Sequence, residues 1–355
     1  MNTGRPIFVV GNLHTGTSLV SNILGLHPDV FMIPGETRFF SELATIRRRF
    51  SDLNLYETRA DLVVFIRNLV CTRDPVTLIF GDPAAPLDNK IEIDLTDEEI
   101  SCIVSSTSKN DSYGRIYRIV CDNLAIKSGS TRWLDKSPDH VYHLHEIMTE
   151  IPDALVVETV RDPRDVLVSR IARDSIEWQV RRGPRDPSLR RWHHGGYHPF
   201  WDSLRWRAAV KAGRSASSSH PVRLFRSRYE DLVISPEMHI RSLCRFLELE
   251  FDRNMLAVEW RNSTSSTQLQ QGIGSQATGK WRASLPSEAI ATCQAVNRAA
   301  MRELHYEPRA ISLSTIPRVV WLLFTSVPQL IQRSYRRFRL GGVRKLLRMG
   351  RIIKQ

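Results

Sequence analysis

Three short apolar runs along the chain predict buried β-strands. They span residues 7–10, 154–160 and 222–225, and they are rich in Val, Ile, Leu and Phe. Apolar residues at helical spacing follow each run: Leu19, Val20, Ile23 and Leu24 after the first, Val166, Leu167 and Ile171 after the second, and an amphipathic stretch at residues 240–249 after the third. Strands that alternate with helices favour an α/β fold, with three layers and a central, mostly parallel sheet.

The segments between these patterns predict one main domain. Residues 51–125 are of mixed polarity and helical in places, so we expect a partly helical insertion or cap that covers the sheet. Residues 262–279 are rich in Ser, Thr, Gln and Gly, which predicts a loop. We therefore expect a single domain over residues 1–315 and a basic, helical C-terminal tail over residues 316–355.

The positive charge of the chain is concentrated in that tail. The 355 residues include 50 Lys and Arg and 38 Asp and Glu, for a net charge of +12, and the 42% hydrophobic content is sufficient for a large core. Ten of the basic residues and no acidic residue follow Ile316, which leaves 40 basic and 38 acidic residues in the body. A nearly balanced body is untypical of nucleic-acid-binding proteins, so we expect no nucleic-acid partner.

The tail has an amphipathic pattern. An apolar stripe at helical spacing consists of Val320, Phe324, Val327, Ile331, Tyr335 and Phe338, and a second basic stretch follows Gly341 and Gly342. An apolar face beside ten cations is typical of a helix that lies on an anionic membrane surface. Packing of the stripe on the protein's own body, or on another subunit, would also account for the pattern.

The remaining targeting signals indicate a cytoplasmic protein that is at most peripheral on a membrane. The first apolar run, residues 7–10, is too short for a signal peptide, and the apolar stretch at residues 319–324 is too short to span a bilayer. The five cysteines are widely spaced and form no C-x-x-C pair, which is typical of reduced thiols in the cytosol.

The loop after the first strand has the composition of an anion-binding site. It reads Gly11-Asn-Leu-His-Thr-Gly-Thr-Ser18, so backbone N–H groups and a helix N-terminus can surround an anion. The spacing resembles the nucleoside-triphosphate loop G-x-x-x-x-G-K-[ST], but Thr17 occupies the lysine position. The missing lysine disfavours a P-loop nucleotide kinase or hydrolase, which is the alternative enzyme. An inactive nucleotide-binding, membrane-associated protein is the alternative outside the enzymes.

Five short motifs, in order, resemble those of sulfotransferases that use 3′-phosphoadenosine 5′-phosphosulfate (PAPS). They are His14-Thr-Gly-Thr-Ser-Leu19, Asp135-Lys-Ser-Pro138, Arg161-Asp-Pro-Arg-Asp-Val-Leu-Val-Ser169, Tyr229-Glu-Asp-Leu-Val233 and Gly279-Lys-Trp-Arg282. The resemblance covers about residues 5–310 and implies a P-loop-like sulfotransferase architecture. It also implies transfer of a sulfuryl group from PAPS to a hydroxyl or amine, with no metal required.

The resemblance implies a set of cofactor-binding residues. The loop residues His14, Thr15, Gly16, Thr17 and Ser18 would hold the 5′-phosphosulfate, Arg161, Ser169 and Arg173 would hold the 3′-phosphate, and Tyr229, Ser266 and Lys280 would make further contacts. The product would be adenosine 3′,5′-bisphosphate (PAP). Guanidinium groups suit phosphates because charge-assisted hydrogen bonds are strong. An Arg before Asp-Pro also occurs as an ordinary helix-start signal.

A second loop carries the residue expected to act as the base. The run Leu26-His-Pro-Asp-Val30, followed by Gly35-Glu-Thr-Arg38, resembles tyrosylprotein sulfotransferases, in which the Glu is the general base, and related bacterial enzymes share much of this framework. A carboxylate near a dry cleft suits removal of a proton from an acceptor hydroxyl, so Glu36 is expected to be the base. An ion pair between Glu36 and Arg38 is the structural alternative.

His14 departs from the family pattern, which usually has Arg or Lys at this position of the loop. Imidazole can donate to a leaving oxygen, but its charge at neutral pH depends on its surroundings. We therefore expect the catalytic role of His14 to be pH-sensitive or shared with Lys136. A histidine that only caps the turn is the alternative.

The resemblance leaves the acceptor class open among a carbohydrate, a lipid, a small molecule and a tyrosyl group. Residues 178–207 are dense in Arg, Trp and His, and they either line the acceptor entrance or form a solvated surface with a few core Trp residues. His193 and His194 in this run have no carboxylate or cysteine at ligand spacing, so no metal site is expected there.

Overall fold

The computed structural model describes residues 3–71, 93–182, 197–261, 269–324 and 326. The strands are β1 (Ile7–Gly11), β2 (Val30–Met32), β3 (Arg132–Lys136), β4 (Leu155–Val160), β5 (Leu224–Arg228), β6 (Glu259–Arg261) and β7 (Leu269–Gln271). The α-helices are α1 (Thr17–Leu24), α2 (Leu43–Arg49), α3 (Tyr56–Val70), α5 (Asp97–Ser106), α6 (Tyr113–Lys127), α7 (Leu144–Glu150), α8 (Pro163–Arg182), α9 (Pro199–Ser219), α10 (Tyr229–Ile234), α11 (Pro236–Leu247), α12 (Trp281–Ser284) and α13 (Ser287–Glu303). Short 3-10 helices are η1 (Phe40–Glu42), η2 (Pro138–His143), η3 (Arg253–Ala257) and η4 (Leu313–Thr315).

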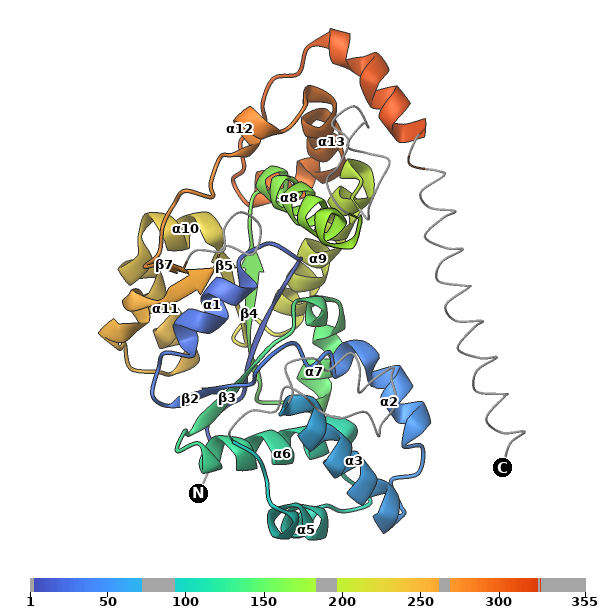
Figure 1. Ribbon diagram of the computed structural model, residues 1–355, viewed down its shortest axis with the longest axis vertical. Helices are drawn as coiled ribbons and strands as arrows, with labels where there is room; N and C mark the ends of the chain where they lie inside the picture. The colour runs from blue at the N-terminus through green and yellow to red at the C-terminus, as the bar shows by residue number, and fades with distance from the viewer. Residues whose placement is uncertain (1–2, 72–92, 183–196, 262–268, 325, 327–355) are drawn as a thin grey trace, which may run out of the picture.

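Five parallel strands form the central sheet, in the order β2-β3-β1-β4-β5 (Figure 1). The middle strand is β1, in which Val9 pairs with Lys136 of β3 and Gly11 pairs with Thr159 of β4. The expected α/β fold with a central parallel sheet is confirmed. Because the carboxyl ends of parallel strands meet at one edge of a sheet, the residues that follow β1, β3 and β4 lie near one another.

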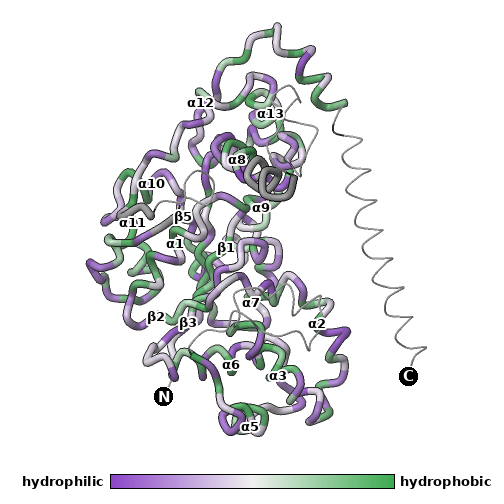
Figure 2. Tube along the Cα trace, in the orientation of Figure 1, coloured by the Kyte–Doolittle hydropathy of each residue, from purple (hydrophilic) through white to green (hydrophobic). Residues whose placement is uncertain are grey.

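Helices cover both faces of the sheet, as the apolar sequence of β1 requires. Its residues 7–10 are all fully buried, which is typical of a parallel strand enclosed on both sides. Phe8 and Val10 belong to a core shared with α2, α3, α5, α6 and α7, whereas Ile7 and Val9 belong to a core shared with α1, α10 and α11. Each such side chain contributes roughly 1.5–3 kcal/mol through burial. In Figure 2 hydrophobic positions are concentrated in the elements around the sheet.

Within the segment 51–125, α6 packs on β2 and β3, α3 packs on α6, and α5 packs on α3. Leu62 of α3 and Ile116 of α6 are fully buried, and they share one apolar core with Phe8 of β1 and Trp133 of β3. These helices therefore form one of the two outer layers and are part of the main core.

Two strands of the sheet, β2 and β3, are missing from the predicted elements. β2 is only three residues long, within the apolar run 30–33, and β3 is mostly charged. β3 has the sequence Arg-Trp-Leu-Asp-Lys. Its first side chain, that of Arg132, donates hydrogen bonds to backbone carbonyl groups that are distant in sequence: Nε to Arg5 O at 2.7 Å and Nη1 to Leu247 O. The third predicted strand, residues 222–225, is shifted, since β5 begins two residues later. β5 is an edge strand that pairs with β4, and Val222 before it is 78% exposed.

The amphipathic helix after β5 ends earlier than the apolar pattern at residues 240–249 predicts. Glu248 adopts a left-handed conformation with φ of 58°. The N–H groups of Glu248 and Leu249 donate to Arg245 O and Cys244 O, at 3.3 and 2.9 Å. These bonds cap the C-terminus of α11 and turn the chain out of the helix.

One carboxyl group lies inside the core, in the middle of β4. Glu158 is 1% exposed, and its Oε2 accepts a hydrogen bond from Arg226 Nε of β5 at 2.8 Å. Gly213 of α9 packs against this carboxyl group so closely that a Cβ would lie 2.0 Å from Oε1. Burial raises the pKa of Glu158 to about 7, and the guanidinium of Arg226 opposes that rise.

We expect this buried carboxyl group to make the stability of the protein depend on pH. Between pH 4.5 and about 7 the native state keeps a proton on Glu158 that the unfolded chain releases, so the free energy of unfolding should fall as the pH rises. Glu158→Gln removes this titration. The stability of the wild type relative to the variant should therefore fall by about 1–3 kcal/mol between about pH 5 and about pH 8. Urea unfolding of both proteins measures the effect, and equal pH dependence would contradict it.

Candidate functional site

The loop between β1 and α1 has a backbone shape that its neighbours enforce. Gly16, which precedes α1, has φ of 101°, and a Cβ at this position would lie 2.8 Å from Tyr229 Cδ2. His14 is also left-handed, with φ of 68°, which is uncommon for a residue with a Cβ. The first N–H groups of a helix have no partner within it, so the N-terminus of α1 adds free N–H groups to this loop, as an anion-binding site requires.

The side chains of this loop divide into two groups. The Thr15 hydroxyl is buried, where it donates to Asn12 O at 2.6 Å and lies 2.8 Å from Thr159 Oγ1. This hydroxyl therefore braces the loop against β4. Thr17 and Ser18 are the first two residues of α1, and of these Ser18 is exposed and Thr17 is buried.

Arg161 connects separate segments of the chain through one guanidinium group. It follows β4 directly and is 7% exposed. Its Nη1 donates to His14 O at 3.2 Å and to Ser169 Oγ at 3.3 Å, and its Nη2 donates to Ala277 O at 2.6 Å. The guanidinium also lies over the ring of Tyr229, 4.6 Å from the centroid. Four of the predicted cofactor-binding residues, His14, Arg161, Ser169 and Tyr229, are therefore in contact.

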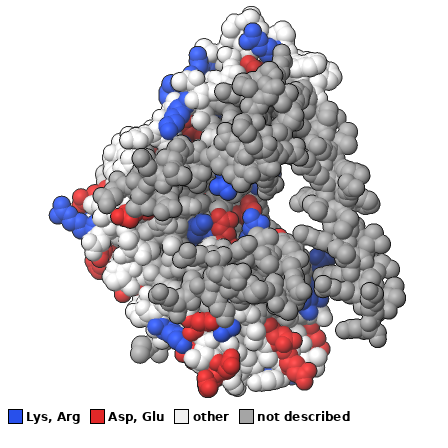
Figure 3. Space-filling model, viewed as in Figure 1, with Lys and Arg blue, Asp and Glu red and all other residues white. Residues whose placement is uncertain are grey.

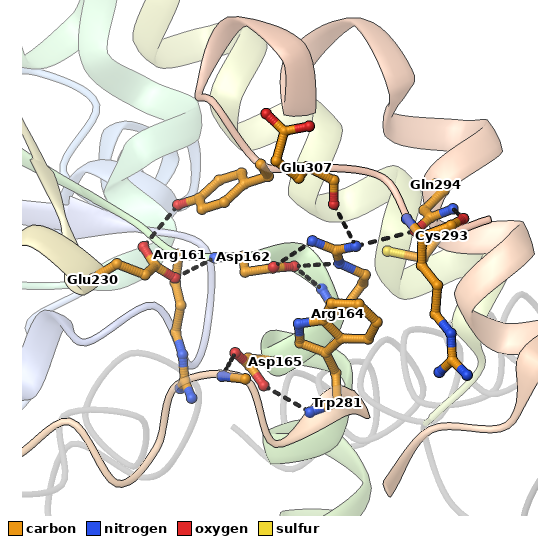
Figure 4. Close-up of polar contacts among 12 residues, drawn as sticks. Arg161, Asp162, Arg164, Asp165, Glu230, Trp281, Cys293, Gln294 and Glu307 are labelled. Atoms are coloured by element: carbon orange, nitrogen blue, oxygen red, sulfur yellow. Dashed lines mark hydrogen bonds and ion pairs between the residues drawn. The ribbon is translucent and has the colours of Figure 1, made fainter. Parts of the chain in front are cut away.

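Asp165 fastens the segment before α12 to the first turn of α8 (Figure 4). Its Oδ2 accepts a hydrogen bond from Gly279 N at 2.7 Å, and its Oδ1 accepts one from Trp281 N at 3.0 Å. Burial raises the pKa of Asp165, although Arg161 and the two N–H groups oppose that rise. The exposed Lys280 lies between the two residues that Asp165 holds, three positions after Ala277, whose carbonyl oxygen accepts a hydrogen bond from Arg161.

Further polar contacts fix the start of α8, as Figure 4 shows. Asp162 accepts two hydrogen bonds from the Arg164 guanidinium, at 2.9 and 2.7 Å, and its N–H donates to Glu230 Oε1 at 2.9 Å. Glu230 also accepts from Tyr306 Oη at 3.0 Å, and burial raises the pKa of this carboxyl group. Arg164 lies 3.8 Å from the ring centroid of Trp281. These contacts therefore fix the position of the backbone that follows Arg161.

Glu36 forms an ion pair with Lys136 at the same edge of the sheet. Lys136 Nζ donates to Glu36 Oε1 at 2.9 Å, and the lysine and glutamate side chains are 16% and 35% exposed. Lys136 is the last residue of β3, the neighbour of β1. The sequence suggested Arg38 as the alternative partner of this carboxylate, but the structure shows Lys136 there. Arg38 adopts a left-handed conformation, with φ of 54°, and its N–H donates to Ser137 Oγ at 3.3 Å.

The fully buried Asp135 joins the loop of Glu36 to the end of β3. Its Oδ2 accepts hydrogen bonds from Thr37 Oγ1 at 2.8 Å and from Tyr117 Oη at 2.9 Å, and its Oδ1 accepts one from Ser137 Oγ at 2.8 Å. Thr37 follows Glu36 directly, and Ser137 follows its lysine partner. This hydrogen-bond network therefore fixes the backbone next to both members of the ion pair between Glu36 and Lys136.

The comparisons with known proteins agree with this geometry. A family model described as the sulfotransferase family matches residues 6–253, which is more than half of the chain and includes the loop, Glu36, Lys136 and Arg161. The chain belongs to the sulfotransferase family. No curated protein sequence matches it.

Solved structures of other sulfotransferases are similar to this chain. The sulfotransferase domain from the curacin biosynthetic pathway superimposes with a TM-score of 0.50 at 19% identity, over 87% of this chain and 100% of that one. The sulfotransferase domain from the Synechococcus PCC 7002 olefin synthase gives a TM-score of 0.46 at 18% identity, over 83% and 94% of the two chains. Mouse sulfotransferase SULT7A1 complexed with PAP gives 0.40 at 12% identity, over 84% and 85%. The first of these confirms the expected sulfotransferase architecture.

The structure describes only some of the remaining predicted residues. Arg173 is exposed on α8, four residues beyond Ser169, and Ser266 lies outside the described residues. Of the Arg- and Trp-rich run, residues 183–196 also lie outside them, and so do His193 and His194. Trp206 is a core residue, and its Nε1 donates to Arg161 O at 3.0 Å. Within the described ranges, no group of three or more His, Cys, Asp or Glu could hold a metal ion.

Sequence reasoning missed Asp135 and Asp165. Both lie inside sulfotransferase-like motifs, but the sequence assigned no role to either of them. A short carboxylate in a buried strand, or in the first turn of a helix, is a signal of such positioning roles, because buried carboxylates require hydrogen-bond donors.

Proposed function

We propose that this protein moves a sulfuryl group from PAPS to a hydroxyl or amine of an acceptor, with Glu36 as the general base. The observation that supports the proposal is the meeting of two sets of residues at the carboxyl edge of the sheet. The set around Arg161 offers cations and hydrogen-bond donors. The pair of Glu36 and Lys136 offers a carboxylate and an ammonium group.

The residues around Arg161 fit a phosphate group. Arg161, Ser169 and Lys280 are hydrogen-bond donors, and Arg161 Nε is buried without a hydrogen-bond partner among the described residues. A buried donor without a partner costs about 1–3 kcal/mol, which a phosphate oxygen would offset. These residues and Tyr229 would hold the 3′-phosphate side of PAPS, and the loop around Gly16 would hold the 5′ side. When bound, PAPS supplies an activated sulfuryl group with PAP as the leaving group.

The ion pair fits the acceptor side of the reaction. More than a third of the Glu36 side chain is exposed, so an acceptor hydroxyl can reach its carboxylate. In the proposed reaction the hydroxyl proton passes to Glu36 as the acceptor oxygen bonds to sulfur. Lys136 orients the carboxylate and offers positive charge where the leaving oxygen becomes negative, and His14 offers a hydrogen-bond donor there.

Ligand binding separates this proposal from that of a P-loop kinase or hydrolase. Because Thr17 replaces the lysine that neutralises the β- and γ-phosphates, we expect PAP to bind at least about tenfold more tightly than ATP. Isothermal titration calorimetry with the two nucleotides measures the difference. Tighter binding of ATP, with its hydrolysis, would favour the alternative.

A transfer assay tests the activity itself. PAPS labelled in its sulfuryl group is incubated with the protein and with one acceptor class at a time. The classes are carbohydrates, lipids, small hydroxyl compounds including phenols, and tyrosyl peptides. We expect label to appear in one acceptor class, and only in the presence of the donor and the intact protein. Binding of PAP without transfer to any class would favour an inactive nucleotide-binding protein.

A further inference from the structure

The end of the described chain is a helix that contacts the body along one side. η4 leads into a helix over residues 316–324, which extends from the outer end of the molecule in Figure 1. Leu322 is 4% exposed and Ser326 is 6% exposed. Trp201 Nε1 of α9 donates to Ser326 O at 3.1 Å, which attaches this helix to the body.

The opposite side of the same helix is apolar and exposed. Five residues form this apolar face, and they are 81%, 52%, 46%, 61% and 70% exposed, respectively: Leu313, Ile316, Val320, Trp321 and Phe324. Ile316, Val320 and Phe324 are four residues apart and therefore follow one side of the helix. Trp321 lies beside this row, three residues before Phe324, and Leu313 belongs to η4, three residues before Ile316. Figure 2 shows hydrophobic positions along this helix. Within the described ranges, the apolar face is therefore not packed on the protein's own body.

The charge of the surrounding sequence indicates what would cover this face. Ten Lys and Arg residues and no acidic residue occur from Pro317 to the end of the chain, and all but Arg318 lie beyond the described helix. The body, in contrast, carries both signs of charge, which Figure 3 shows on one of its faces. The apolar face is followed in sequence by a basic segment. A surface with anionic groups above an apolar layer is complementary to both.

We propose that the apolar face docks on an anionic lipid surface. Trp321 and Phe324 would enter the boundary between headgroups and acyl chains, where aromatic side chains are favoured, and the basic residues would contact lipid phosphates. Binding to nucleic acid would use the cations but would leave the five apolar side chains in water. None of the described helices is both long and apolar enough to cross a membrane, so the proposed mode is docking on one face.

Cosedimentation of the full-length protein with lipid vesicles tests this proposal. We expect binding to vesicles of phosphatidylcholine mixed with phosphatidylglycerol, weaker binding to pure phosphatidylcholine, and loss of binding at high salt. The double variant Trp321→Ser/Phe324→Ser should bind at least about tenfold more weakly, because it removes two large apolar side chains from the docking face. Transfer of sulfate to an acceptor free in solution should not change.

A matched control removes exposed apolar side chains from elsewhere on the body. Val222 and Met238 are 78% and 68% exposed, so Val222→Ser/Met238→Ser makes a similar change far from the C-terminal helix in sequence. This variant should bind vesicles like the wild type. Equal binding of all three proteins, or no binding by any of them, would overturn the proposal. Self-association of the wild type without vesicles, lost in Trp321→Ser/Phe324→Ser, would assign the face to a second copy and would also overturn it.

Discussion

Replacing Arg161 with alanine should weaken the binding of PAP by a factor of roughly 30–1,000, or about 2–4 kcal/mol. Arg161 is 7% exposed and is the cation at the centre of the predicted 3′-phosphate site. Its loss would leave a buried phosphate without a charged partner. Isothermal titration calorimetry of the wild type and the variant measures the effect.

The choice of ligand distinguishes this role from a general loss of structure. Adenosine 5′-monophosphate lacks the 3′-phosphate, so Arg161→Ala should change its affinity far less than that of PAP. The guanidinium also donates to His14 O and Ala277 O, so thermal unfolding must show that the variant is folded. Equal losses for both nucleotides would remove Arg161 from the 3′-phosphate site.

Turnover should fall at least about a hundredfold in Glu36→Gln, while the affinity for PAP stays near that of the wild type. Glutamine keeps the shape of the side chain and can still contact Lys136, but it cannot accept a proton from the acceptor hydroxyl. Steady-state sulfotransfer with saturating PAPS, combined with titration of PAP, separates the two effects.

A matched variant and a partner variant sharpen this test. Glu57→Gln changes an exposed carboxylate on α3 and should leave turnover unchanged. Lys136→Ala removes the ammonium group 2.9 Å from Glu36 and should also lower turnover. If Glu36→Gln turns over like the wild type, the base lies elsewhere and the resemblance to the tyrosylprotein enzymes is misleading on the acceptor side.

The longer apolar strands of the sheet could be predicted from sequence, whereas the three-residue β2 and the polar β3 could not. The run at residues 7–10 is buried on both faces, so hydrophobicity alone indicates it. β3 contains Arg132, Asp135 and Lys136, whose burial depends on carbonyl, hydroxyl and carboxylate partners far away in sequence. A local pattern carries no information about such partners.

The same distinction applies to the site. Short motifs indicated His14, Arg161, Ser169 and Tyr229, and the structure brings these residues into contact. The partner of Glu36 was harder to predict, because Lys136 lies 100 positions away and the pairing of β2 with β3, in which Met32 aligns with Leu134, brings its strand beside the loop of Glu36. Local spacing suggested the nearer Arg38 instead.

The order of strands in the sheet has a consequence for folding during synthesis. β1 is the first strand to leave the ribosome, but its two neighbours are β3 and β4, which end at residues 136 and 160. Both edges of this apolar strand are unpaired until β3 has emerged, and one edge stays unpaired until β4 has emerged, so the strand is available to other nascent chains. Formation of the sheet must therefore wait for nearly half of the chain, and a pause in translation before residue 160 would be the period of greatest risk of aggregation.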